Sequence, residues 1–458
     1  MGQSELPVDI KNLIKKSEAG DAKSQFTLGA RYKHGRDVEQ NYEKAATWFS
    51  KAAEQGHTPA QNSLGIMYNN GEGVERNSHK AAELYRKAAE NGNDAAQFNL
   101  GMMYIEGDGV EKNYTMAQEL FHQASQSTNP NISFDAFEMK DLAERYQLSE
   151  KITTIREDIL TQLEADTIKT PTMTHYTSLI AGHSLLFEQS PLRLGHINSL
   201  NDPNEGKLLW RYLGHAPIEG KPIFMGCFLP DDDSLNMWRF YSKNLNNDDA
   251  CGCAITFCTN EFFDFSLVKE SPIDTHLNEK RMAKPNTWKS PQDRATFYRI
   301  IYISEGMNIH GDDNDMLKKL FVRLRDEVEA FIGNEPKDEK PQQLSRLLGP
   351  LPFLLKDADY EAEKEHRIIV THLEYGAHEI QVLAPILENG IPQTSPKLYL
   401  ELHRENHLAP VKHITLGPKA PHQDMMAPYW HHKLASDFTD QVRAKSDFYV
   451  RISKCAYK

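Results

Sequence analysis

The chain has 458 residues, 39% of them hydrophobic and 26% charged, which is typical of a globular protein of two or three domains and excludes a largely disordered chain. The formal net charge of −13 disfavours a protein that binds nucleic acid through a basic surface. No apolar run approaches the roughly 20 residues that a membrane-spanning helix needs, and the five cysteines show no disulfide framework. We therefore expect a soluble protein of the reducing cytoplasm that does not enter a membrane.

The first third of the chain repeats itself at an interval of 36 residues. Equivalent leucines, glycines and tyrosines recur in "FTLGARY", "NSLGIMY" and "FNLGMMY", which begin at Phe26, Asn62 and Phe98. Each copy predicts a helix, a glycine-containing loop and a second helix with one apolar face. Because one copy cannot bury that face alone, the three copies predict a short helical solenoid.

These motifs resemble the Sel-like repeat family, which is related to the tetratricopeptide repeats. The resemblance covers residues 21–130, after an N-terminal helix or cap at 1–20, and Arg36 and Asp37 depart from the repeat pattern. Members of the family are protein-binding scaffolds, so the resemblance implies a protein partner on the repeats. The alternative is that the repeats only support the next domain.

Residues 131–170 predict a helical connector whose first part caps the last repeat. From 171 to 458, short β-branched and aromatic runs alternate with turn residues and a few helical patterns, which predicts an α+β domain with a mixed sheet. The expected fold is therefore multidomain, an all-α helical-repeat solenoid followed by an α+β mixed-sheet domain. The sequence contains no dinucleotide-binding, Walker or nucleophile-elbow motif.

Four polar motifs of the second domain stand out in chain order, namely "HYTS", "NDPNE", "MWRFY" and "EAEKEHRIIV". Together they resemble a bacterial family known only as the domain of unknown function numbered 2971, over residues 172 to 420. Glu363, Glu365 and Arg367 alternate at the start of an expected strand, so we expect them to share one face. The candidate site residues are His175, Tyr176, Ser178, Asn201, Asp202, Trp238, Tyr241, Glu363, Glu365 and Arg367.

The same order of motifs is also similar to that of ADP-ribosyltransferases, and this remote resemblance implies NAD as a substrate. Breaking the bond between nicotinamide and ribose passes through an oxocarbenium-like state, which a carboxylate beside the ribose stabilises. Glu365 is expected in that role, and Glu363 is expected to orient or deprotonate the acceptor. His175 would bond a ribose hydroxyl, and Tyr176 or Tyr241 would stack on the nicotinamide ring.

Each candidate also has a structural alternative. The two glutamates can flank Arg367 on an exposed strand, His175 can be an ordinary partly buried histidine, and Trp238 is more often a core residue. The segment 201–203 predicts a structural turn. The run 231–233, "DDD", predicts a solvated loop.

Two other functions stay open from the sequence. One is a metal-dependent nuclease or phosphoesterase with Asp202, Glu363 and Glu365 as oxygen ligands for Mg²⁺. The other is a non-catalytic adaptor in which both domains bind proteins or a small ligand. Our main interpretation includes no metal site. The motif "CGCAITFC" lacks C-x-x-C spacing and predicts buried thiols in an apolar strand.

Overall fold

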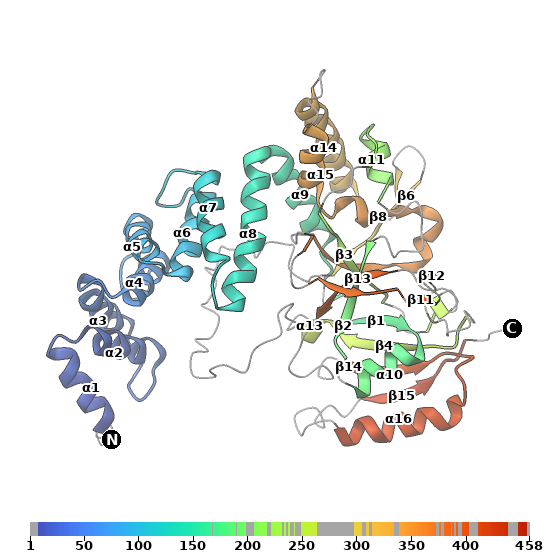
Figure 1. Ribbon diagram of the computed structural model, residues 1–458, viewed down its shortest axis with the longest axis horizontal. Helices are drawn as coiled ribbons and strands as arrows, with labels where there is room; N and C mark the ends of the chain where they lie inside the picture. The colour runs from blue at the N-terminus through green and yellow to red at the C-terminus, as the bar shows by residue number, and fades with distance from the viewer. Residues whose placement is uncertain are drawn as a thin grey trace. The chain divides into compact units, whose positions relative to one another are not determined.

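A computed structural model shows two compact units, the first ending at Leu148 and the second beginning at Ser149 among the described residues (Figure 1). The expected connector at 131–170 is therefore divided between them. Each unit is described by itself below. The structure describes residues 8–455 except 167, 189, 198–205, 218–220, 231–232, 235–236, 239–241, 243–248, 263–296, 305–307, 311–313, 334–338, 372–374, 377–379, 386, 389–390, 393–395, 403–410 and 438–447.

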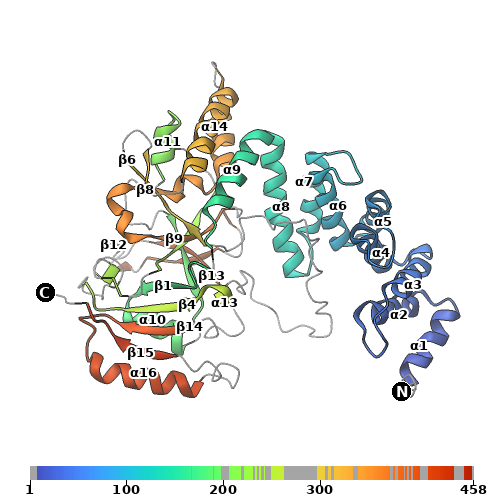
Figure 2. The same ribbon diagram turned by 180° about the vertical axis from the view of Figure 1, so that it is seen from behind.

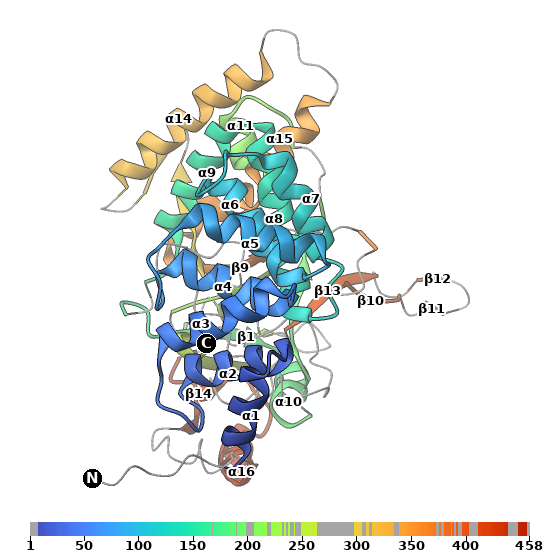
Figure 3. The same ribbon diagram turned by 90° about the vertical axis from the view of Figure 1, so that its left-hand side faces the viewer.

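The first unit is a stack of helix pairs, which confirms the predicted solenoid (Figure 3). The first helix of each pair ends at a glycine in the left-handed conformation, and an asparagine caps the start of the second helix. The helices are α1 (Val8–Glu18), α2 (Ala22–His34), α3 (Tyr42–Glu54), α4 (Thr58–Asn70), α5 (Ser78–Glu90), α6 (Asp94–Glu106), α7 (Tyr114–Ala124) and α8 (Pro130–Leu148).

Within each pair the two helices meet where a glycine faces an aromatic ring. A Cβ atom added to Gly65 would lie 2.7 Å from the ring of Tyr85, and one added to Gly101 would lie 2.9 Å from the ring of Phe121. Both rings are buried. These glycines therefore allow the helices to approach closely, because any side chain there would push the pair apart.

A second set of glycines joins one repeat to the next. A Cβ atom on Gly73 would lie 2.2 Å from the carbonyl carbon of Tyr42, and one on Gly109 would lie 2.4 Å from that of Ser78. The equivalent residue of the first repeat is Asp37, which has a φ of 61° and pairs with Arg31. In the described residues only α1 precedes the first repeat, so no second helix of an earlier pair lies against this loop and the loop accommodates the Asp37 side chain.

The helix α8 closes the other end of the stack. Its Tyr146 ring stacks on Tyr114 at 5.3 Å, and its Gln147 Nε2 donates a hydrogen bond to Thr115 Oγ1 at 3.2 Å. In the preceding repeats the start of the second helix receives a glycine loop from the next repeat. Side chains of α8 take the place of that loop, so the helix caps the last repeat.

The second unit begins with α9 (Glu150–Leu163) and combines several β-sheets with helices, as the α+β prediction requires (Figure 2). Its later helices are α10 (Leu179–Phe187), α11 (Leu208–Tyr212), α13 (Thr259–Phe262), α14 (Asp315–Ile332), α15 (Lys340–Leu348) and α16 (Gln423–Asp437), with the 3-10 helices η2 (Leu351–Leu354) and η3 (Ala358–Glu363). The strands are β1 (Thr172–Thr177), β2 (Leu192–His196), β3 (Phe224–Phe228), β4 (Cys253–Cys258), β5 (Tyr298–Arg299), β6 (Ile301–Ser304), β7 (Asn308–Ile309), β8 (Leu355–Asp357), β9 (His366–Val370), β10 (Gln381–Leu383), β11 (Leu387–Glu388), β12 (Ile391–Pro392), β13 (Lys397–Leu402), β14 (Val411–Leu416) and β15 (Tyr449–Ile452).

Two sheets share the main core of this unit. One has the strand order β10-β13-β2-β3-β9-β5 and the other β1-β4-β14-β15. Phe228 of the first sheet and Phe257 of the second belong to one cluster of buried side chains. A backbone bridge between Thr174 and Leu229 also links β1 to the end of β3. The start of the domain therefore lies beside β3 and close to its neighbour β9.

A third sheet, with the order β7-β6-β8, pairs β6 and β8 in parallel, and β14 and β15 are parallel as well. The other ladders between the strands named above are antiparallel, so the sheets are mixed. In the described ranges, every helix is too short or too polar to cross a membrane.

The glycine contact between repeats predicts the outcome of one substitution. Gly109→Ala places a methyl group against the backbone of Ser78 at a φ of 69°, so we expect a loss of at least about 2 kcal/mol in unfolding free energy. Denaturant unfolding followed by circular dichroism measures it.

The matched control is Gly92→Ala, which has a φ of 77° and nothing within 4 Å of the added Cβ atom. This control retains the backbone strain without the contact, and we expect it to lose about 1 kcal/mol. Equal losses in the two variants would show that the inter-repeat contact does not matter.

Candidate functional site

The motif "EAEKEHRIIV" does not lie on one strand. Glu363 is the last residue of η3, Lys364 has a φ of 49°, and β9 begins only at His366. The prediction that Glu363, Glu365 and Arg367 alternate along one strand face is therefore wrong for Glu363. A residue in the left-handed conformation reverses the local chain direction, so the two-residue strand period does not extend through Lys364.

The two glutamates nevertheless meet at Lys356 of β8. The Lys356 Nζ atom lies 2.6 Å from Glu363 Oε2 and 3.0 Å from Glu365 Oε2. Arg367 Nε lies 2.7 Å from Glu365 Oε1, and its Nη2 donates to Glu365 Oε2 at 3.1 Å. These four side chains, which we call the Lys356 cluster, are each no more than 9% exposed. The motif thus builds a buried, charge-balanced ion network instead of a solvated edge.

Backbone contacts hold this cluster between three elements. Glu365 N donates to Tyr302 Oη at 2.8 Å, and Arg367 Nη1 donates to the carbonyl of Phe353 at 2.6 Å. Tyr302 lies in β6 and Phe353 in η2. The cluster therefore joins β9 to the third sheet and to the turn that precedes β8.

The pKa values of the two glutamates are shifted in opposite directions. Burial alone would raise the pKa of Glu365, but the charges of Arg367 and Lys356 outweigh it and hold the pKa at about 2. Burial raises the pKa of Glu363, and its hydrogen bond from Lys356 offsets only part of the effect. Glu365 is consequently a fixed anion, whereas Glu363 is the more easily protonated of the two.

His175 approaches the same region from β1. Its Nδ1 lies 3.3 Å from the carbonyl oxygen of Cys227, and burial lowers its pKa. Cys227 of β3 pairs with Arg367 of β9, and its side chain hydrogen-bonds Glu365. The structure therefore brings the early imidazole and the late acid to one residue of β3, where each contacts a different part of Cys227.

Tyr176 and Trp238 pack against each other in a separate cluster. Their rings meet edge to face at 4.9 Å, and they are 4% and 0% exposed. Ser234 N donates to Tyr176 Oη at 2.9 Å. This is the packing of core residues, which the sequence left open as the alternative for Trp238, and both rings are buried. The prediction that Tyr176 stacks on a nicotinamide ring is not supported by this burial.

Of the four remaining candidate residues, the structure describes only Ser178. Ser178 caps α10, where its Oγ accepts a hydrogen bond from Ala181 N at 3.2 Å. Asn201, Asp202 and Tyr241 lie outside the described residues.

Sequence reasoning missed Asp233, which was expected in a solvated loop. Its carboxylate accepts hydrogen bonds from Trp238 Nε1 at 2.8 Å, Ser453 Oγ at 2.5 Å and Lys454 N at 2.8 Å. Burial tends to raise the pKa of Asp233, but these hydrogen bonds together lower it. The solvated-loop prediction is wrong at Asp233, because its acceptors are used to hold the last described residues of the chain.

Two of the three acids considered as Mg²⁺ ligands, Glu363 and Glu365, are bonded to the Lys356 ammonium group, and the third, Asp202, lies outside the described residues. In the described ranges, no group of three or more histidine, cysteine, aspartate or glutamate side chains is arranged to hold a metal ion. The Lys356 ammonium occupies the space between Glu363 and Glu365. Of the five cysteines, all free thiols, Cys253 is fully buried, and burial raises its pKa to about 12.

Comparisons with known proteins identify the repeats. Residues 22–57, 58–93 and 94–129 each match the model of the Sel1 repeat, so residues 22–129 are Sel1 repeats. No match was found among curated proteins.

Three solved structures illustrate the similarity. The first is c5321, a protective antigen of uropathogenic Escherichia coli strains displaying an SLR fold, with 36% identity over 31% of this chain and 29% of that chain and a TM-score of 0.28. A Sel1 repeat protein from Oxalobacter formigenes is 33% identical over 29% of this chain and 53% of that chain, with a TM-score of 0.27. Helicobacter pylori cysteine rich protein B is 26% identical over 27% of this chain and 90% of that chain, with a TM-score of 0.23. This chain matches less than two thirds of the length of the first two of these proteins.

The Lys356 cluster predicts the effect of neutralising one acid. Glu365→Gln leaves Arg367 and Lys356 with one buried carboxylate between them, so we expect a loss of about 3 to 5 kcal/mol in unfolding free energy at pH 7. Denaturant unfolding of the full chain measures it. Glu361→Gln is the matched control, because Glu361 is an exposed acid on the same segment, and its change should stay within about 0.5 kcal/mol.

The pH dependence gives the same experiment a second readout. Since the pKa of Glu365 is lower in the folded chain than its ordinary value of 4.5, its stabilisation is full above about pH 4.5 and declines as the pH falls toward 2. Glu363, whose pKa is raised, contributes with the opposite sign. The difference between wild type and Glu365→Gln should therefore shrink as the pH falls from about 4.5 to 2, and a constant difference would contradict this assignment.

Proposed function

We propose that this protein is a scaffold whose Sel1-repeat solenoid binds a protein partner and carries the α+β unit with it. The observation on which this rests is the match of residues 22–129 to three Sel1 repeats, which typically mediate protein–protein interaction. Stacked helix pairs expose an extended side-chain surface that is suited to such a partner.

The compartment belongs to the same proposal. All five cysteines are free thiols, which fits a reducing environment such as the cytoplasm. The net charge of −13 favours a protein partner over nucleic acid.

The scaffold proposal predicts where a partner contacts the chain. The partner is recovered from source cells with the full chain as bait, purified, and cross-linked to the full chain with a short amine-reactive reagent. Cross-links identified by mass spectrometry should concentrate on residues 22–129, which contain lysines in every repeat. Glu365→Gln, a change in the other unit, should leave the dissociation constant within about twofold. Cross-links confined to residues 149–455 would overturn the proposal.

A second candidate concerns the α+β unit, which we propose uses NAD to ADP-ribosylate a protein or nucleic acid. Its support is the approach of His175 and Glu365 to Cys227, in addition to the remote sequence resemblance to ADP-ribosyltransferases. Arg367 and Lys356 engage both oxygens of Glu365, so this carboxylate would act as a fixed charge near the ribose.

Glu363 is better placed than Glu365 to move a proton. Its Oε2 accepts from Lys356, whereas its Oε1 makes no hydrogen bond to the described residues. Its raised pKa brings the carboxyl closer to the range that general acid–base catalysis needs. In this proposal Glu363 is the group that deprotonates the acceptor.

The NAD proposal is tested by release of nicotinamide and transfer of label from NAD by the full chain in cell lysate. Glu363→Gln should lower the rate by about 100-fold or more, and Glu361→Gln should leave it unchanged. If calorimetry detects no NAD binding and no label is transferred, the α+β unit is not an NAD-using enzyme and the adaptor alternative stands.

A further inference from the structure

In the first two repeats a lysine ammonium group lies over a tyrosine ring, and the third repeat lacks the equivalent lysine. Lys44 Nζ lies 5.3 Å from the centre of the Tyr32 ring, and Lys80 Nζ lies 5.3 Å from that of Tyr68. The residue 36 positions after Lys80 is Met116, which is 39% exposed. Among the described residues, no ammonium group covers the ring of Tyr104, the third tyrosine of the series.

The neighbouring repeat supplies a cation to Tyr104 in a different way. Arg86 of α5 is exposed, and its Nη2 lies 3.5 Å from Tyr104 Oη. The equivalent position one repeat earlier is Ser50, which carries no charge. The guanidinium group beside Tyr104 therefore has no equivalent one repeat earlier. Among the described contacts, Arg86 has no carboxylate partner.

A hollow of about 500 Å³ opens at this position. The exposed guanidinium group of Arg86 forms part of its wall, together with Lys112 and Glu111. The Tyr104 hydroxyl, the Asn113 amide and the apolar side chain of Val110 also line the hollow, so it can accommodate a polar side chain. The hollow is lined by Arg86, Tyr104, Val110, Glu111, Lys112 and Asn113.

We propose that this hollow receives an aspartate or glutamate side chain from an acidic segment of the protein partner. The inference rests on the proposed scaffold function and names one part of the partner-binding surface. A planar guanidinium group binds a carboxylate through two parallel hydrogen bonds, and the Tyr104 hydroxyl supplies a further donor. Charge complementarity thus selects an acidic segment over a neutral or basic one.

The direct test uses a fluorescent peptide of alternating glutamate and serine, with a glutamine and serine peptide as the neutral counterpart. Anisotropy with the full chain should detect binding of the acidic peptide only. Arg86→Ser should weaken binding about 5-fold, as expected for one partly exposed ion pair, and Arg86→Glu should weaken it further. Arg86 is exposed, so unchanged unfolding curves will verify that both variants fold.

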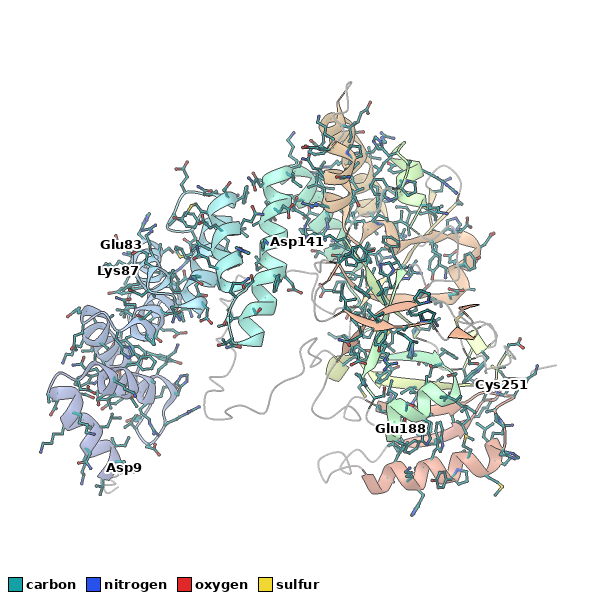
Figure 4. All side chains as sticks on the ribbon, in the orientation of Figure 1. Asp9, Glu83, Lys87, Asp141, Glu188 and Cys251 are labelled. Carbon is teal, nitrogen blue, oxygen red and sulfur yellow. The ribbon has the colours of Figure 1, made fainter. Side chains whose placement is uncertain are left out.

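Lys87→Ser is the matched control, because it removes one positive charge at the next residue of α5 and Lys87 does not line the hollow. Lys87 is labelled in Figure 4. It should change the affinity by less than about twofold. Equal weakening by Arg86→Ser and Lys87→Ser would show that net charge, and not the hollow, governs binding. Failure of the acidic peptide to bind the wild type would also overturn the inference.

The purified partner separates this inference from the scaffold function. If its cross-links fall on residues 22–129 but Arg86→Glu leaves its affinity unchanged, the hollow is not its subsite and the scaffold function stands. If the partner makes no contact with the repeats, the scaffold function itself is wrong, whatever the peptide does.

Discussion

The solenoid depends on the absence of side chains at its glycine contacts. Helix pairs close onto Tyr85 and Phe121 because Gly65 and Gly101 leave room for the rings, and repeats join because Gly73 and Gly109 admit a neighbouring backbone. Each contact is local, so every repeat contacts mainly its neighbours and the stack grows by addition. The same constraint determines where the stack ends. Asp37 occupies the position of the joining glycine in the first repeat, and α8 covers the start of the last helix pair. The described stack therefore consists of the three repeats at residues 22–129 and the capping helix α8.

In the α+β unit a different interaction, the balance of charges in the Lys356 cluster, joins β9 to the third sheet. Two buried cations and two buried carboxylates satisfy one another, which makes burial tolerable although each ion alone would be costly to remove from water. The geometry also narrows the chemistry that this motif can perform. A carboxylate that accepts from both Arg367 and Lys356 has its oxygens committed, so Glu365 can act on a substrate only as a fixed charge. Proton transfer at this site would have to involve Glu363.

Features set by short-range periodicity could be predicted from the sequence, and features set by distant partners could not. The helices and their caps depend on residues within one or two turns. The stacking glycines contact more distant residues, but they recur at the same 36-residue interval in the sequence. The role of Asp233 depends on Ser453, 220 residues away, so an acidic run gave no sign of it. Glu363 was predicted to lie on the strand, but Lys364 adopts a left-handed conformation, which cannot be predicted from a lysine in the sequence. His175 and Glu365 were predicted to lie around one ligand, but the contact of His175 with β3 could not be predicted, since the register of β1 against β3 is a tertiary property.

Net charge and local charge act on different length scales in partner binding. The charge of −13 repels an acidic partner at long range, but at physiological ionic strength this repulsion is largely screened beyond about 8 Å. The guanidinium of Arg86 acts at contact distance, where desolvation strengthens a paired charge. Recognition of an acidic segment would therefore be governed by the lifetime of the complex and not by the speed of encounter. Added salt would then have two opposing effects, weakening the contact pair while relieving the repulsion, so the affinity would vary less with salt than that of a uniformly basic surface.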